Sequence, residues 1–168
     1  MPFEPSIRPL GAFLKALQQE GIDCILIGAM AAIQQGAPLM TVDYDLWVRL
    51  PERQYVRLLS IVQRLGGTIR AQTLYELSDG TQVNAIFHPS GLHSFEAEWK
   101  HCRPGKLDNV PVRVLPLGRV IASKRAASRE KDLAVLPILE RTLRLVEKLK
   151  GRSSLRAKAG LRSKRKRK

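Results

Sequence analysis

Two aspartates separated by one residue, Asp43 and Asp45, are the residues of this chain best placed to do chemistry. The apolar run Leu46 to Val48 follows them, and together they are typical of a β-strand. Because residues i and i+2 of a strand project from the same face, the two carboxylates point the same way, roughly 7 Å apart along the chain. Carboxylate oxygens are ligands that Mg²⁺ prefers. The spacing therefore predicts a magnesium site.

A glycine turn precedes these aspartates. The apolar run Cys24 to Ile27 predicts a buried strand that ends at Gly28, and Ala29 to Gln35 predicts a short helix that Gly36 ends. The amides at the start of a helix favour anions. The order strand, glycine, helix, strand thus predicts a phosphate-binding turn at Gly28 beside the magnesium site.

The remaining pattern supplies the elements that must position these residues. It predicts helices over Pro9 to Glu20, Pro51 to Leu65 and His93 to His101, and over Leu117 to Leu149 with a break around Ser128. It predicts strands over Thr68 to Ala71, Leu74 to Leu77, Thr81 to Phe87 and Val110 to Leu115, with an Asp79-Gly80 turn and a proline, Pro111, in the last strand. This order favours an α/β (α+β) domain with a small mixed β-sheet, helices packed on it and further helices at the C-terminus.

Charge divides the chain into two parts. The net charge is +14, and the segment 150–168 holds ten basic residues and no acidic one. We expect residues 1–149 to form one domain and residues 150–168 to be a disordered basic tail. Such a tail suits contact with nucleic acid; the alternatives are a membrane surface, for which it lacks an apolar face, and a purely solubilising end.

Other classes of protein are excluded by composition. No apolar run approaches the roughly 20 residues of a membrane span, and the first ten residues lack the pattern of a signal peptide. Cys24, Cys102 and the three histidines match no zinc-ligand spacing. We expect a cytoplasmic protein that does not enter a membrane.

Two segments in this order resemble a known family. Gly28-Ala29, the short helix and Thr41-x-Asp43-x-Asp45 are similar to the nucleotidyltransferase superfamily with a polymerase-beta-like core. The later segment LGRVIASKRAASREKDLAVL, residues 117–136, is similar to the small nucleotidyltransferases of the abortive-infection toxin type. The resemblance covers roughly Gly11 to Leu143.

The resemblance implies a role for each candidate residue. Gly28, Ala29 and the amides after them would receive the triphosphate of an NTP, and Lys124 would approach its phosphates as a point charge. Asp43 and Asp45 would bind Mg²⁺, and a third carboxylate on a later strand would complete a second metal site and activate the attacking hydroxyl. Arg129, Lys131 and Asp132 would frame the lysine helix, although Asp132 also suits a structural ion pair.

The chain departs from the family pattern at three places. Ala29 stands where a glycine or serine is usual, and Leu39 and Met40 stand where an arginine is common. The third carboxylate aligns with Asn84, whose amide carries no negative charge and cannot accept a proton as a carboxylate does. Asp79 or Glu76, on the neighbouring hairpin, are alternative sources of the missing group.

Three functions follow as hypotheses. The first is a Mg²⁺-dependent nucleotidyltransferase that moves NMP from an NTP to a hydroxyl of RNA, protein or a small molecule, in a toxin-antitoxin or defence system. The second is a catalytically degenerate member of the fold that binds nucleotide or nucleic acid, which Asn84 favours. The third is a nucleic-acid-binding protein that acts through its basic tail. The acceptor, the preferred base and the oligomeric state stay open.

Overall fold

The computed structural model describes residues 7–165, and the side chains of residues 7–162. Its seven strands are β1 (Cys24–Ile27), β2 (Asp43–Val48), β3 (Thr68–Ala71), β4 (Leu74–Glu76), β5 (Gln82–Ile86), β6 (Arg103–Leu107) and β7 (Val110–Val114). They form one mixed sheet in the order β3-β4-β5-β2-β1-β7-β6. Only the β1–β7 and β2–β5 pairs are parallel. The α/β class and the small mixed sheet expected from the sequence are confirmed.

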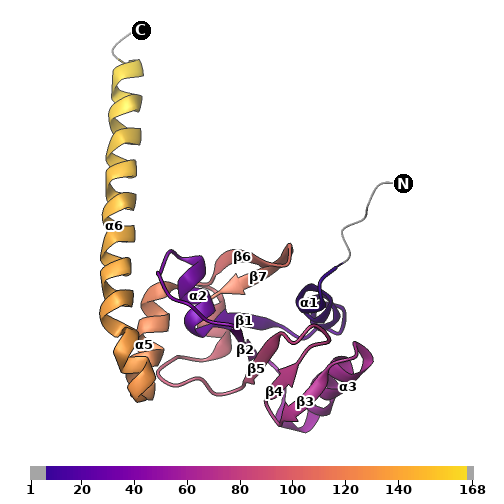
Figure 1. Ribbon diagram of the computed structural model, residues 1–168. Helices are drawn as coiled ribbons and strands as arrows, with labels where there is room; N and C mark the ends of the chain where they lie inside the picture. The colour runs from indigo at the N-terminus through magenta and orange to yellow at the C-terminus, as the bar shows by residue number, and fades with distance from the viewer. Residues whose placement is uncertain (1–6, 166–168) are drawn as a thin grey trace.

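The helices fall into two groups around this sheet. They are α1 (Pro9–Gln19), α2 (Gly28–Gln34), α3 (Val56–Arg64), α4 (Phe95–Trp99), α5 (Leu117–Ala127) and α6 (Glu130–Arg165), with a 3₁₀ turn at Glu52–Gln54. Helices α1 and α3 contact each other, whereas α2 packs on α5 and α5 packs on α6 (Figure 1). Fully buried apolar side chains join them to the sheet, among them Phe13, Leu17, Leu26, Leu58 and Val83.

Strand β6 was not expected from the sequence. Its five residues, Arg103–Leu107, include Pro104 and Gly105, which are both unfavourable in strand interiors. The strand is tolerated because it pairs with β7 alone and forms one edge of the sheet. In β7, Pro111 lies beyond the two residues that pair with β1, so its missing N–H costs no hydrogen bond to that strand.

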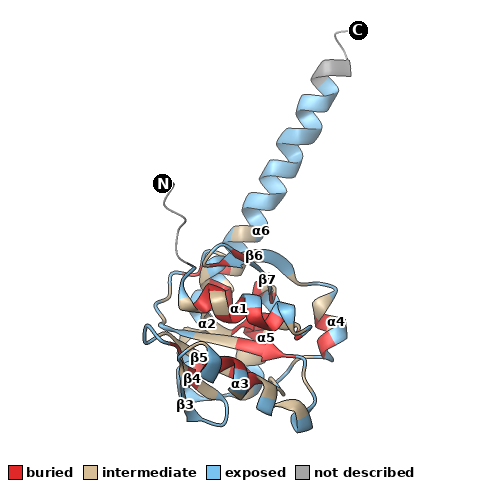
Figure 2. Cartoon of the chain, turned by 90° about the vertical axis from the view of Figure 1, so that its right-hand side faces the viewer, coloured by how far each residue is buried: buried red, intermediate tan, exposed pale blue. Residues whose placement is uncertain are grey.

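The C-terminal helices confirm one expectation and correct another. Ser128 adopts a left-handed conformation (φ 52°) and separates α5 from α6, as the break in the pattern predicted. The expected disorder after residue 149 is wrong for residues 150–165, which continue helix α6. Lysine, arginine, leucine and alanine are good helix formers, and the absence of an apolar period does not prevent a solvated helix. Within this outer part of α6, residues 150–162 are all exposed (Figure 2).

Two buried carboxylates tie these helices together. Glu98 of α4 accepts hydrogen bonds from Arg119 of α5, with Nε–Oε1 at 3.0 Å, and from the backbone N–H of His93. Asp132 of α6 accepts from Lys124 of α5 at 2.9 Å and from Arg129 at 2.5 Å. Each of these two side chains is 2% exposed, so each carboxylate needs these partners to stay ionised inside the protein.

No helix within residues 7–165 combines the length and the apolar character that crossing a bilayer requires.

The buried carboxylates make stability depend on pH. Burial alone would raise the pKa of Glu98, but the hydrogen bonds from Arg119 and His93 lower it below its ordinary 4.5. Burial likewise opposes the hydrogen bonds of Arg129 and Lys124, which lower the pKa of Asp132 below 3.8. A lowered pKa in the folded state means that the unfolded chain binds protons first as the pH falls. The stabilisation is therefore complete above about pH 4.5 and is lost as the pH falls through the folded-state pKa values.

We expect the free energy of unfolding, measured by urea titration between pH 3 and pH 6, to decline below about pH 4.5. Glu98→Gln should lower stability at neutral pH and flatten this decline. Glu147→Gln, at an exposed position without an ion pair among the described residues, is the control and should leave the decline unchanged. An equally steep decline in Glu98→Gln would contradict the assignment.

Candidate functional site

Asp43 and Asp45 begin strand β2 at the middle of the sheet. Asp43 is exposed and Asp45 is half-buried. The neighbouring strands place Ile27 of β1 on one side of Asp45 and Asn84 of β5 on the other. The parallel pairing of β2 with β5 also sets Asp43 beside Gln82. Because side chains at i and i+2 share a face, Asp43, Asp45 and Asn84 project from the same face of the sheet.

Asn84 holds the Asp45 carboxylate in place. Its Nδ2 donates a hydrogen bond to Oδ1 of Asp45 at 2.9 Å. The position that the sequence aligned with a third carboxylate thus lies directly beside the aspartate pair, as expected. A carboxylate at this position would repel Asp45 unless a cation lay between them. The amide replaces that repulsion with a hydrogen bond, so Asp45 stays fixed without a bound cation.

The glycine turn meets the same carboxylate from the other side. Gly28 follows β1 directly, begins α2 and has a positive φ of 68°. A Cβ built at Gly28 would lie 2.3 Å from Oδ2 of Asp45. Only glycine leaves room for this contact, so the two segments that the sequence pattern joined are also joined in space. The first amides of α2, those of Gly28 and Ala29 included, have no partner within the helix.

The two alternative carboxylates, Glu76 and Asp79, already accept hydrogen bonds from other groups of the protein. Glu76 shares the site face, because it pairs with Gln82 across β4 and β5, but it accepts two hydrogen bonds from Arg70, at 3.0 and 2.9 Å. The Asp79 carboxylate accepts a hydrogen bond from the Thr81 N–H within the hairpin turn, at 3.0 Å. Neither group is arranged to replace the missing carboxylate at Asn84.

Lys124 lies on α5 and binds a carboxylate of the protein itself. Its Nζ is 2.9 Å from Oδ1 of Asp132, and its side chain is 15% exposed. The structural ion pair considered for Asp132 is therefore present, with Arg129 as the second partner. An ammonium has three N–H groups, so one hydrogen bond to Asp132 leaves donors for another anion. The contact of Lys124 with a nucleotide phosphate stays a prediction.

Apolar side chains lie at the entrance to β2, where the family pattern has an arginine. Met40 is fully exposed and Val42 is 78% exposed, immediately before Asp43. The segment offers one side-chain contact to the site, a hydrogen bond from the Asp43 N–H to Oγ1 of Thr41 at 3.3 Å. A phosphate approaching from this side meets no guanidinium.

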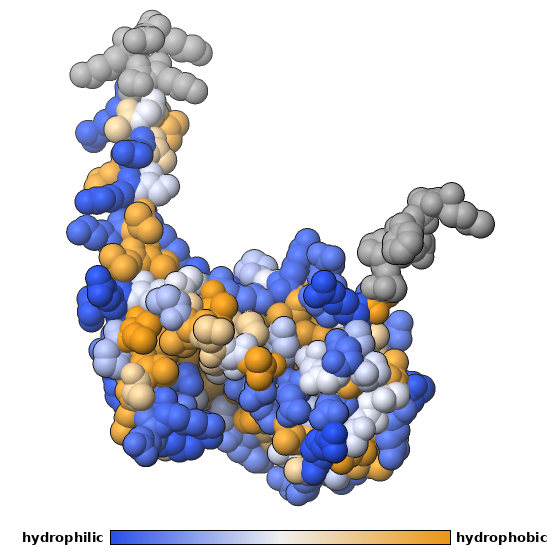
Figure 3. All heavy atoms as spheres, viewed as in Figure 1, coloured by the Kyte–Doolittle hydropathy of each residue, from blue (hydrophilic) through white to orange (hydrophobic). Residues whose placement is uncertain are grey.

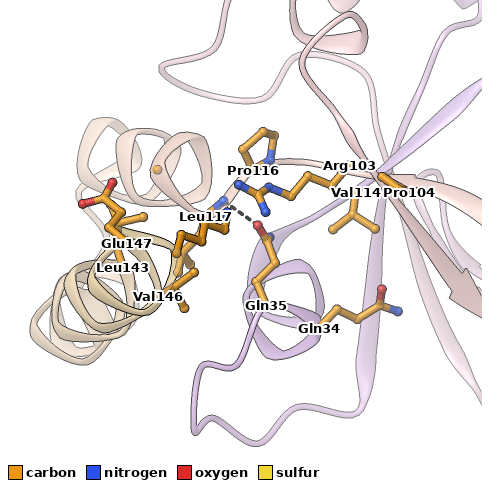
Figure 4. A pocket seen from close by; sticks show the side chains of 12 residues that line it. Gln34, Gln35, Arg103, Pro104, Val114, Pro116, Leu117, Leu143, Val146 and Glu147 are labelled. Carbon is orange, nitrogen blue, oxygen red and sulfur yellow. Dashed lines mark hydrogen bonds between the residues drawn. The ribbon is translucent and has the colours of Figure 1, made fainter. Parts of the chain in front are cut away.

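A groove of about 640 Å³ opens at the far end of α2, away from the aspartates. It is lined by Gln34 of α2, by Gln35 immediately after that helix, by the edge strand β6 and by the helices α5 and α6 (Figure 4). The Gln35 amide crosses its floor, accepting from the Leu117 N–H and donating to the Leu115 carbonyl, both at 2.9 Å. Sequence reasoning missed this groove because its wall includes β6, which was itself not expected.

The comparisons with known proteins concern the fold. No family model and no curated protein matches the chain. Among solved structures, the antibiotic-resistance factor ANT(2'')-Ia is 17% identical over 89% of this chain and 91% of that one, with a TM-score of 0.54. The lincosamide antibiotic adenylyltransferase LnuA is 8% identical over 79% of this chain and 94% of that one, with a TM-score of 0.55.

An antigenic nucleotidyltransferase-like protein from Paracoccidioides brasiliensis is 16% identical over 86% of this chain and 79% of that one, with a TM-score of 0.51. The chain has a nucleotidyltransferase fold. At these identities the likeness concerns the fold, and it gives no evidence for the toxin subtype.

The donor set at this site fits one magnesium ion. Two carboxylates and an amide oxygen are hard oxygen ligands, and Mg²⁺ is usually bound by one or two carboxylates together with substrate phosphates and water. A second ion would need more negative charge than Asn84 supplies. Among the described residues, no group of three or more histidine, cysteine or acidic side chains is clustered around a metal position.

The contact between Gly28 and Asp45 predicts an unequal pair of glycine variants. Gly21 and Gly28 share a φ of 68°, but a Cβ at Gly21 meets nothing within 4 Å. Gly21→Ala should lower the free energy of unfolding by about 1 kcal/mol through backbone strain alone. Gly28→Ala should lower it by about 2–4 kcal/mol, because its methyl group also displaces the Asp45 carboxylate. Urea unfolding measures both; equal losses would show that the contact does not constrain residue 28.

Proposed function

We propose that the protein is a Mg²⁺-dependent nucleotidyltransferase, which transfers NMP from an NTP to a hydroxyl acceptor. One observation carries the proposal: the Asp45 carboxylate lies against the Gly28 turn, on the same face as Asp43, in a nucleotidyltransferase fold. Transfer of this kind requires positioned phosphates and neutralised charge more than it requires covalent chemistry by the protein. The site offers groups for both tasks.

Each residue has a separate task in this proposal. Asp43 and Asp45 would hold Mg²⁺, which neutralises charge on the phosphates when it is bound. Asn84 keeps Asp45 in one orientation through its hydrogen bond. The amides that follow Gly28 receive phosphate oxygens, and Lys124 adds a positive charge while it stays anchored to Asp132.

Asn84 also determines how the acceptor loses its proton. In the transfer, the acceptor oxygen bonds to the α-phosphorus, pyrophosphate leaves and the hydroxyl proton is released. A neutral amide cannot take that proton, and Glu76 is engaged by Arg70. We assign the proton to solvent water, which makes the reaction slow compared with that of a site having three carboxylates.

The second candidate is that the protein is a catalytically degenerate member of the fold, which binds a nucleotide without transferring it. The hydrogen bond from Asn84 to Asp45 favours it, because the site is already satisfied without a second metal ion. Such a protein would bind nucleotide and transfer nothing. The two candidates differ in turnover and share the same binding site.

The solved structures of similar fold suggest small molecules as one class of acceptor. One ANT(2'')-Ia structure is a complex with adenylyl-2''-tobramycin, and the LnuA structure has lincomycin bound, so those proteins carry small molecules. For this chain we keep RNA, protein and small molecules as acceptors, with action in the cytoplasm and in a toxin-antitoxin or defence system. Labelled NTP incubated with total RNA, total protein or an antibiotic panel distinguishes these acceptors.

We expect Asp43→Asn and Asp45→Asn each to lower the rate of label transfer by at least about 100-fold, because each removes a carboxylate that would hold the Mg²⁺ whose charge neutralises the phosphates. Asp79→Asn removes the same charge from the neighbouring hairpin and should leave the rate unchanged. Circular dichroism checks that each variant keeps the fold. A rate retained in Asp45→Asn would refute the assignment of the site.

Asn84→Asp separates the two candidate functions. If the natural chain is an enzyme, its own transfer should already exceed background, and the restored carboxylate should raise that rate by about 100-fold or more as a general base. If the natural chain is degenerate, transfer should rise from background in Asn84→Asp at millimolar Mg²⁺. Asn84→Ala is the matched control, since it removes the hydrogen bond to Asp45 without adding charge.

A further inference from the structure

Helix α6 carries a line of five basic residues that the nucleotide site does not use. The line, called here the basic stripe, consists of Arg141, Arg144, Lys148, Arg152 and Arg156. All five are exposed, and within the described part of the chain none of them pairs with a carboxylate. The helix projects from the body of the protein, with blue basic side chains along it (Figure 3).

The spacing puts these charges on one side of the helix. Successive members are three or four residues apart, which is the spacing of neighbours on a helical surface. Four residues rise about 6 Å along the axis, so the stripe presents a row of cations at that interval. Phosphates of a nucleic-acid strand follow one another every 3.4 Å along the axis of a duplex, which allows about one cation for every two phosphates.

Like charges at this spacing disfavour the helix that carries them. Neighbouring cations four residues apart repel one another, and a solvated helix without tertiary contacts is only marginally stable. The residues beyond Lys150 have no buried member among those whose side chains are described. A polyanion bound along the stripe would reduce the repulsion between these cations and give them oppositely charged partners.

The apolar residues of α6 do not form a membrane-binding face. Leu145 and Leu149 lie beside the stripe and are exposed. Leu155 and Leu161 are also exposed, but they are turned by roughly 80° and 160° from Leu145 around the helix. An interfacial helix needs one continuous apolar face. Charge, and not apolar area, is what this surface offers.

We propose that the basic stripe of α6 is a docking surface for RNA. The phosphate backbone supplies the complementary charge in a row. The choice of RNA over DNA rests on the proposed function, because every RNA nucleotide presents a 2′-hydroxyl that a nucleotidyltransferase site could use as acceptor. The root of α6 packs on α5, and α5 packs on α2, which begins at Gly28 beside Asp45. RNA on the stripe would thus be bound to a helix that is connected to the site through its packing on α5.

The test measures binding of a fluorescein-labelled 20-nucleotide RNA of mixed sequence to the full chain between 50 and 200 mM salt. If five phosphates are neutralised, affinity should fall about 100-fold over this range, since log K changes by about 0.7 per phosphate for each unit of log salt. Replacing all five stripe residues by glutamine should weaken binding at least tenfold at 100 mM salt and reduce the salt slope by about 3.

The matched control changes five exposed basic residues that lie outside the stripe and have no ion pair among the described residues: Lys15, Arg53, Lys100, Lys106 and Lys131. Both variants lose the same net charge, so loss of binding in the stripe variant alone supports the proposal. Equal loss in both, no RNA binding at 50 mM salt, equal affinity for DNA of the same sequence, or tighter binding to phosphatidylserine vesicles would overturn it. Circular dichroism verifies that the stripe variant retains its helix.

Two further results separate this inference from the proposed function. Asp45→Asn should bind RNA as the natural chain does, because Asp45 lies on β2 and not on α6. Mg²⁺-NTP binding should be the same in the stripe variant and in the natural chain. If the natural chain binds NTP but not RNA, the docking surface is refuted and the proposed nucleotide site is not.

Discussion

The Asp45 carboxylate is the point on which the candidate site depends. One of its oxygens accepts a hydrogen bond from Asn84, and the other lies against Gly28, where no side chain could fit. These contacts join strands β2 and β5 and the first turn of α2 around one side chain. A carboxylate fixed in this way has little freedom to lose when a cation or a phosphate arrives, which favours binding. The same constraint explains why residue 28 must be glycine and why the chain turns so abruptly after β1.

Buried ion pairs extend this organisation to the C-terminal helices. Lys124 and Arg129 meet at Asp132, and Arg119 meets Glu98, so α4, α5 and α6 are locked to one another by charge as well as by apolar packing. The residue expected at the phosphates, Lys124, is also a member of this network. A charge held by the fold is positioned before the ligand binds, and it costs no reorganisation when the ligand arrives.

Local patterns predicted most of the fold because they carry most of its determinants. Asp43 and Asp45, followed by the apolar run Leu46 to Val48, identified β2 and the shared face of its two carboxylates, and Ser128 was correctly placed at a helix break. The position of Asn84 beside Asp45 was expected from the family pattern, and the β2–β5 register agrees with it. Contacts between residues far apart in the sequence could not be predicted from local patterns. The contact between Gly28 and Asp45, the bidentate capture of Glu76 by Arg70 and the groove beside α2 depend on how separate segments meet in space.

The two errors have opposite causes. Strand β6 was missed because Pro104 and Gly105 argue against a strand, although an edge position tolerates both. The helix over 150–165 was taken for disorder because its charges show no apolar period, although its residue types favour helix.

Calorimetric titration with each NTP, in Mg²⁺ and again in EDTA, tests the central claim most directly. The account predicts saturable binding of at least one NTP that requires Mg²⁺ and is lost in Asp43→Ala, while Asp79→Ala binds as the natural chain does. Binding that persists in EDTA, or that survives in Asp43→Ala, would contradict a metal-dependent nucleotide site on β2. If no NTP binds, this protein has kept the nucleotidyltransferase fold and lost the ability to bind a nucleotide.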